Sequence, residues 1–266
     1  MDEGGSKTFA EERRAAILDM LEHAASVQVN ELARAFGVSA VTARADLDAL
    51  ERAGKLRRTH GGAVSLHKSL TVSVQDKRVN VNAGAKRAIA RAALQLVKSG
   101  DTVLVDSGTT ALEFVRMLDL RSDITVITAD VTIADYIDDS MPTVDVMLLG
   151  GSLRKGHRYL YGPLALRSLE ILHADLAVIC PGALAPARGL MTDFPQMAEL
   201  KRAMIAAADS AVALADKSKI GRGGVLRFAT LSEVDALVVD KDPSGTLAAA
   251  IEEIPSADRR PKLITA

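Results

Sequence analysis

The stretch Val27–Val64, VQVNELARAFGVSAVTARADLDALERAGKLRRTHGGAV, decides the fold of the first quarter of the chain. Two short helical patterns meet at the turn Gly37-Val38-Ser39, and a basic strand with a His-Gly-Gly turn at residues 60–62 follows them. This order of pieces is typical of a winged helix-turn-helix, which lays its second helix in the major groove of DNA. The stretch therefore predicts a DNA-binding domain.

Apolar residues at helical spacing place the pieces of this domain. They predict a first helix over Glu11–His23 and a short second helix that is capped by Asn30. Gly37 is expected to supply a left-handed turn, after which Ser39 caps the recognition helix and Gly54 follows its end. The inward positions of that helix are Ala43, Leu47 and Leu50.

Positive charge gathers on this segment although the net charge of the chain is −1. Between Arg34 and Lys68 there are seven Lys or Arg residues against three acidic ones, which suits contact with phosphates. Arg44 is the long donor on the outer face of the recognition helix. The DNA-contact candidates are Ser39, Thr42, Arg44, Arg57, Arg58, His60 and Gly61. The alternative is a three-helix domain that packs on protein.

Length and composition bound the rest of the chain. Its 266 residues suit a small domain joined to a larger one, and we expect a winged helix-turn-helix at 9–66, a linker at 67–84 and a second domain at 85–266. A single cysteine excludes an intramolecular disulfide and a multi-cysteine zinc site, and fits a cytoplasmic protein. No signal peptide and no membrane-spanning apolar run is seen.

The second domain alternates short apolar strands with helices. Such strands, uninterrupted by polar residues, indicate an α/β fold whose mainly parallel sheet is covered on both faces. The expected strands are Thr102–Val105, Ile124–Thr128, Val144–Leu149, Leu176–Ile179, Val212–Ala215 and Ala236–Val239. The expected helices include Lys86–Val97, Thr110–Leu118 and Gln196–Ala208.

Polar and glycine residues gather where these strands end, the edge at which open α/β sheets bind ligands. Backbone and hydroxyl donors beside Gly108, with lysine and arginine nearby, suit a phosphate or another anion. Plain helix caps and solvated turns are the alternative reading of each group. The ligand-contact candidates are Asp106, Ser107, Gly108, Thr109, Thr110, Thr128, Gly150, Gly151, Arg154 and Lys219.

The sequence resembles the DeoR family of bacterial transcriptional regulators. The resemblance rests on Thr42–Leu47 and Arg58–Val64 in the first domain. In the second it rests on Asp106–Thr110, Val126–Thr128, Leu149–Arg154, Glu199-x-Lys201 and Asp216-x-Ser218-Lys219, so that it covers nearly the whole chain. Four departures from the family pattern are Ala43, Ala45, Ala129 and Cys180-Pro181.

The resemblance implies a sensor domain with a fold like that of ribose-5-phosphate isomerase. It implies that this sensor domain binds a phosphorylated sugar or related metabolite. It also implies a homo-oligomer, a dimer or tetramer, on operator DNA. We therefore expect a repressor of a carbohydrate-metabolism operon, with no cofactor, metal site or catalytic residue. An active sugar-phosphate isomerase that uses Asp106 or Glu199 as base is the alternative, and a regulator with a diverged ligand is another.

Overall fold

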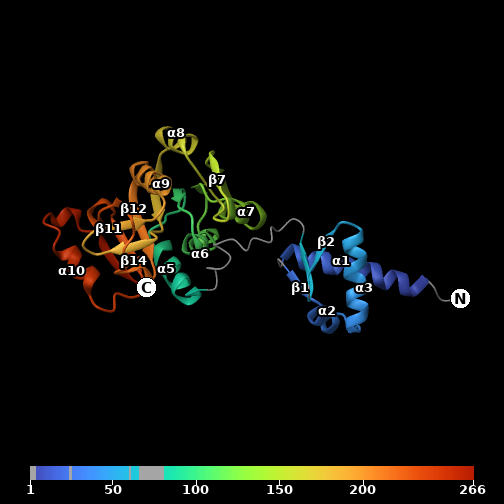
Figure 1. Ribbon diagram of the computed structural model, residues 1–266. Coiled ribbons are helices and arrows are strands. Elements are labelled where there is room, and N and C mark those ends of the chain that lie inside the picture. The colour runs from blue at the N-terminus through green and yellow to red at the C-terminus, as the bar shows by residue number, and fades with distance from the viewer. Residues whose placement is uncertain (1–3, 24–25, 60, 66–80) are drawn as a thin grey trace. The chain divides into compact units, whose positions relative to one another are not determined.

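A computed structural model describes residues 4–23, 26–59, 61–65 and 81–266 (Figure 1). His60 and most of the expected linker, residues 67–80, lie outside the described residues. The chain divides into two compact units, residues 1–72 and 73–266. Of the helices in the described ranges, none is long and apolar enough to cross a membrane.

The N-terminal unit packs three helices against a small antiparallel sheet. Its strands lie in the order β1-β3-β2, and β2 and β3 form the wing. The core buries Ile17, Leu32, Leu47 and Leu56, each at most 2 % exposed. The elements are α1 Gly4–His23, β1 Ser26–Gln28, α2 Val29–Ala35, α3 Ala40–Arg52, β2 Leu56–Thr59 and β3 Gly62–Ser65.

The turns around the recognition helix α3 follow the expectation from the sequence. Gly37 and Gly54 both adopt left-handed backbone conformations, with φ of 63° and 65°. Ser39 is the N-cap of α3. The inward positions Ala43, Leu47 and Leu50 are at most 6 % exposed.

The expected cap of α2 at Asn30 is wrong, because the helix begins at Val29. The backbone N–H of Val29 donates to the carbonyl of Gly61 in the wing turn (2.9 Å). The Glu31 carboxylate accepts from the backbone N–H of Gln28, which is the N-cap residue (3.3 Å). Since these two partners fix the start of the helix, Asn30 lies inside its first turn.

The second unit is built on one seven-stranded sheet in the order β15-β14-β12-β9-β4-β5-β6, with every neighbouring pair parallel. The predicted α/β fold with a mainly parallel sheet is thereby confirmed, and β15 is the strand that the sequence pattern missed. The strands are β4 Thr102–Val105, β5 Ile124–Thr128, β6 Val144–Leu148, β9 Ala174–Ile179, β12 Ala208–Ala215, β14 Ala236–Val239 and β15 Lys262–Thr265.

Helices cover both faces of this sheet. Because strand residues alternate in direction, Val103 and Val105 pack into the core with α5, α6 and α7, whereas Leu104 packs into the core with α8, α9 and α10. This two-sided burial explains why the strands are apolar throughout. The helices are α5 Ala83–Leu94, α6 Thr109–Val115, α7 Val131–Ser140, α8 Pro163–Ile171, α9 Pro195–Ala206 and α10 Thr246–Glu252.

Helix ends differ from expectation by a few residues. The helix expected over Lys86–Val97 begins at Ala83, and beyond Leu94 the N–H groups of residues 95–97 bond to carbonyls three residues back, as in a tightening last turn. The helix expected to end at Leu118 breaks at Val115 and a 3-10 turn, Leu118–Leu120, follows. The helix expected to reach Ala208 ends at Ala206, because Ala208 is the first residue of β12.

Two smaller antiparallel elements were not expected. One is a hairpin of β7 Ser152–Arg154 and β8 Tyr159–Tyr161. The other is a sheet of β10 Ala183–Ala185, β11 Gly189–Thr192 and β13 Leu226–Ala229. These strands have three or four residues and are too short to show a period of two.

Gly62→Ala tests the packing of the wing. A Cβ atom on Gly62 would lie 1.9 Å from the Val27 carbonyl oxygen on the neighbouring strand, so the sheet must open. We expect a loss of about 2 kcal/mol or more in the free energy of unfolding of the N-terminal unit, measured by calorimetry on the full chain. Gly61→Ala is the matched control, since its Cβ would meet only the end of the Gln28 side chain at 3.0 Å. Equal stability of both variants would contradict the described register.

Candidate DNA-binding surface and ligand cavity

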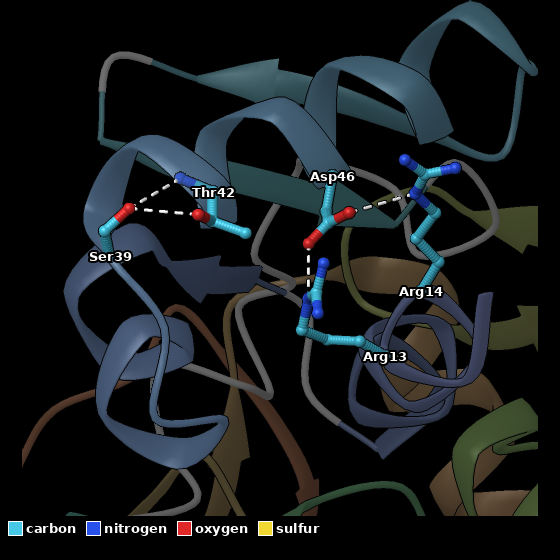
Figure 2. A network of polar contacts seen from close by, with 5 residues as sticks. All are labelled: Arg13, Arg14, Ser39, Thr42 and Asp46. Carbon is cyan, nitrogen blue, oxygen red and sulfur yellow. Dashed lines mark hydrogen bonds and ion pairs between the residues drawn. The ribbon is translucent and has the colours of Figure 1, made fainter. Parts of the chain in front are cut away.

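The N-terminus of α3 is held by a side-chain cap. Ser39 Oγ accepts a hydrogen bond from the backbone N–H of Thr42 (3.1 Å) and lies 3.0 Å from Thr42 Oγ1, as Figure 2 shows. A cap of this kind stabilises a helix by about 1 kcal/mol and fixes where it begins. Both predicted contact residues therefore lie at the start of the recognition helix, where their hydroxyl groups also bond to each other.

The outer face of α3 is open to solvent. Val41, Arg44, Ala45 and Asp48 lie three or four residues apart, so they share one side of the helix, and all are exposed. Val41 is 72 % exposed, which is unusual for a residue of its kind. An apolar side chain beside an arginine suits a thymine methyl group and a guanine edge respectively.

The inner side of α3 is tied to α1 by a buried carboxylate. Asp46 accepts from Arg13 Nε at 2.5 Å and from Arg14 Nε at 3.0 Å, and its side chain is only 3 % exposed. Figure 2 shows both arginines reaching Asp46 from the neighbouring helix. In the sequence, Asp46 is one of the three acidic residues of the basic segment, and its pairing with two arginines of α1 was not predicted. The signal was present, because Asp46 lies beside Leu47 and Leu50 on the inward side.

The wing is joined to the recognition helix by Arg58. Its Nη1 donates to Asp48 Oδ1 (2.6 Å) and to the backbone carbonyl of Arg44 (3.0 Å). The Arg58 side chain is thus bonded within the protein. Arg57, the preceding residue of β2, is exposed, as is Gly61 in the wing turn. Of the predicted wing contacts, Arg57 and Gly61 are presented outward.

In the second unit, a cavity of about 300 Å³ lies at the carboxyl ends of β4, β9 and β12. Five predicted ligand-contact residues line it, which are Ser107, Gly108, Thr109, Thr110 and Lys219. The other lining residues are Val81, Asn82, Lys86, Cys180, Pro181, Gly182, Leu214, Ala215, Asp216, Ser218 and Arg222.

Positive charge dominates the cavity wall. Lys86 of α5, which is 4 % exposed, joins Lys219 and Arg222 around the space, against the carboxylate of Asp216. Gly108, in the loop after β4, has φ of 143°, a conformation that favours glycine. Three cations and a hydroxyl-bearing loop form an arrangement that suits an anion.

One carboxylate organises the wall opposite this loop. Asp216 Oδ1 accepts from the backbone N–H of Ser218 (2.9 Å) and from Asn82 Nδ2 (3.2 Å). Asn82 has φ of 56°, a left-handed conformation that costs a non-glycine residue of the order of 1 kcal/mol. Asn82 and Lys86 were not predicted to line the cavity, because they lie at the start of a helix and not at the end of a strand.

The structure places four predicted ligand-contact residues away from this cavity. Thr128 is fully buried, and its hydroxyl donates to the Val105 carbonyl (2.7 Å), so the prediction that it meets a ligand is not supported by its position. Gly150 and Gly151 precede the β7–β8 hairpin, where a Cβ on Gly151 would lie 2.5 Å from a carbonyl oxygen of β8. Arg154 donates to the Tyr159 hydroxyl (2.5 Å) and lies over the Phe194 ring at 3.9 Å.

Asp106 lies beneath the cavity in a buried ion pair with Lys201. Asp106 Oδ2 accepts from Lys201 Nζ and from the backbone N–H of Cys180 (2.8 Å), while Lys201 Nζ also donates to the Cys180 carbonyl (2.9 Å). Asp106 is 1 % exposed and Lys201 3 %. Asp106 is therefore engaged by Lys201 and Cys180 and is not among the residues that line the cavity, so its contact with a ligand stays a prediction.

Burial also governs the one cysteine. It raises the pKa of the Cys180 thiol to about 12, and the neighbouring Asp106 carboxylate acts in the same direction. The thiol thus stays protonated at neutral pH, which makes it a poor nucleophile. Within the described ranges, no three His, Cys, Asp or Glu side chains are grouped to hold a metal ion.

Comparison with known families matches both units. Residues 13–69 match the profile of the DeoR-like helix-turn-helix domain, and residues 81–241 match that of the DeoR C terminal sensor domain. The transcriptional repressor AccR from Agrobacterium fabrum is 34 % identical over 94 % of this chain and 95 % of its own. The transcriptional repressor GlcR from Bacillus subtilis is 34 % identical over 89 % and 90 %, respectively.

A third relative, the regulator GlpR from Haloferax volcanii, is 33 % identical over 92 % of this chain and 94 % of its own. Among solved structures, ribose 5-phosphate isomerase A from Methanocaldococcus jannaschii is similar with a TM-score of 0.40. That similarity has 18 % identity and covers 52 % of this chain and 55 % of that one.

The buried pair predicts a non-additive pattern of stability. Lys201→Met alone leaves the Asp106 carboxylate buried without its counter-charge, and Asp106→Leu alone strands the ammonium group. We expect each to lower the free energy of unfolding of the second unit by about 3 kcal/mol. The double variant should lose less than the sum of the two, measured by urea denaturation followed by circular dichroism. Additive losses would contradict a coupled pair.

Proposed function

This chain belongs to the DeoR family of transcriptional regulators, and from that premise we propose that it represses a carbohydrate-metabolism operon in the cytoplasm. We further propose that a phosphorylated sugar or related metabolite, bound in the cavity of the second unit, controls the repression. The observation that carries the proposal is the presence, on one chain, of an open recognition helix and a cation-lined cavity at the sheet edge.

On the DNA side, α3 enters the major groove with Arg44 as the reader of a base edge or phosphate. Ser39 and Thr42 meet the phosphate backbone at the start of the helix, and Arg57, His60 and Gly61 do so from the wing. The engagement of Arg58 with Asp48 supports a different part for Arg58, that of a brace between wing and helix.

On the ligand side, the phosphate is bound by the loop Ser107–Thr110 together with Lys219, Lys86 and Arg222. A volume of about 300 Å³ lies at the small end of the range of ligand pockets, which suits a metabolite of one sugar ring. Of the remaining predicted contacts, Arg154 belongs to the β7–β8 hairpin, and Gly150 and Gly151 directly precede it. We keep them outside the proposed phosphate site.

The proposed regulation involves more than one copy of the chain. We propose a homo-oligomer, a dimer or tetramer, whose recognition helices read repeated half-sites of one operator. A ligand that binds one arrangement of these helices better than another alters operator affinity by the ratio of the two affinities. Release of DNA by the ligand is the direction that we propose.

A binding role is favoured over catalysis by where the two proposed bases lie. The Asp106 carboxylate is engaged by Lys201 and the Cys180 amide. Glu199 lines a groove between α8 and α9 and is absent from the lining of the ligand cavity. Neither carboxylate is thus held beside a ligand in the cavity, as a general base for isomerisation must be.

Three arginine variants separate the proposed DNA contacts, measured by fluorescence anisotropy on the duplex that the protein selects from a random pool. Arg44→Ala should weaken the selected duplex more than a scrambled one, by about 5- to 100-fold, because it removes a base contact. Arg57→Ala should weaken both duplexes alike and lower the slope of log Kd against log salt by about one phosphate contact.

Arg58→Ala should lower the stability of the N-terminal unit, with a smaller change in the salt slope than Arg57→Ala, since Arg58 is a brace. A larger effect of Arg58→Ala than of Arg57→Ala on the salt slope would contradict these assignments.

A thermal-shift screen of phosphorylated sugars and polyols locates the ligand. At 100 times its Kd a ligand stabilises the folded protein by about 2.7 kcal/mol, which raises Tm by several degrees. Lys219→Ala should abolish the shift, whereas Lys217→Ala should keep it. Lys217 lies in the same 3-10 turn but does not line the cavity. A shift that survives Lys219→Ala would place the ligand elsewhere.

A further inference from the structure

The wall of the ligand cavity includes the first residues described after the segment that joins the two units. Val81 and Asn82 line the cavity, and Lys86, another lining residue, lies one turn into α5. The described part of the sensor unit therefore begins at the cavity wall. In the sequence, this wall is the described part of the sensor unit that lies nearest to the DNA-binding unit.

Asn82 has a special conformation at this wall. Its φ of 56° and ψ of 33° are left-handed, and its carbonyl accepts the N–H of Lys86 at the start of α5 (3.1 Å). The side chain does not cap the helix and instead donates from Nδ2 to Asp216 Oδ1 (3.2 Å). The backbone at the start of the described sensor unit thus depends on a conformation that is uncommon outside glycine and on one side-chain hydrogen bond.

The same carboxylate oxygen connects Asn82 to the lysine turn. Asp216 Oδ1 also accepts from the backbone N–H of Ser218, which belongs to the turn Lys217–Lys219. Asp216 is 4 % exposed at the end of β12. Asn82 and the turn that carries Lys219 therefore share one hydrogen-bond acceptor at the cavity wall.

We propose that Asn82 transmits occupancy of the cavity to the DNA-binding unit. An anion bound between Lys86 and Lys219 accepts the second N–H of the Asn82 amide and holds Asn82 in its left-handed conformation. This fixes the backbone at Asn82, on the side of α5 that leads in sequence to the DNA-binding unit. Asn82 acts as a positioning residue, and the inference rests on the proposed function, since it takes the effector to be an anion in this cavity.

Two substitutions separate the amide from the backbone. Asn82→Gly keeps the left-handed conformation accessible and removes the amide, whereas Asn82→Ala removes the amide and also disfavours the conformation. Asp123→Gly is the matched control, because Asp123 is another non-glycine residue with positive φ (57°) and does not line the cavity.

The first readout is hydrogen exchange on the full-length protein with inorganic phosphate, against chloride at equal ionic strength. In the unsubstituted chain, phosphate should slow exchange about 5-fold or more both in the loop 107–110 and in the first turn of α5. Both Asn82 variants should lose the protection of α5 while part of the loop protection remains. Asp123→Gly should behave as the unsubstituted chain does.

The second readout is the ratio of Kd values for the selected duplex with and without phosphate, again at equal ionic strength. We expect phosphate to weaken binding about 5-fold or more in the unsubstituted chain, and the ratio to approach one in Asn82→Gly. Protection of the loop with no change in α5, or an unaltered ratio in Asn82→Gly, would overturn the role of Asn82. Protection nowhere in the sensor unit would instead contradict the anion cavity of the proposed function, and this inference with it.

Discussion

The ligand cavity depends on the ion pair between Asp106 and Lys201. Asp106 directly follows β4, Lys201 lies on α9, and both bond to the backbone of Cys180 after β9. One charged pair thus holds the ends of the two central strands of the sheet to a covering helix. Because both groups are almost fully buried, their mutual attraction must offset the cost of removing them from water. Because Asp106 directly precedes the loop Ser107–Thr110, the ion pair fixes where that loop begins.

The two units use buried carboxylates in the same way. Asp46 ties the recognition helix to α1 through two arginines, as Asp106 ties a loop to α9 through a lysine. In each unit, the polar surface that we assign to DNA or to a metabolite lies beside a carboxylate that is paired with a cationic side chain of the protein. The outward groups, such as Arg44 and Lys219, are thereby positioned by neighbours that do not themselves meet the ligand.

The sequence predicts the sheet well because burial on both faces demands apolar strands. The runs at Thr102–Val105 and Ala236–Val239 have the same bounds in the structure. The site is predicted only in part, because residues at strand ends carry no signal for the direction of their side chains. Thr128, the last residue of β5, was predicted to contact a ligand and yet bonds inward to β4. Asn82 precedes a helix rather than following a strand. The rule that ligands bind at the carboxyl ends of strands therefore does not identify it.

We propose that filling the sensor cavity changes the affinity of the recognition helices for DNA. The most direct measurement is the Kd of the full-length protein for its selected duplex, at constant ionic strength, with and without the sugar phosphate that most raises its Tm. We expect the Kd to be at least about 5-fold higher with the sugar phosphate, as for a coupling of about 1 kcal/mol or more. An unchanged Kd at saturating sugar phosphate would contradict the proposed coupling between the cavity and DNA binding.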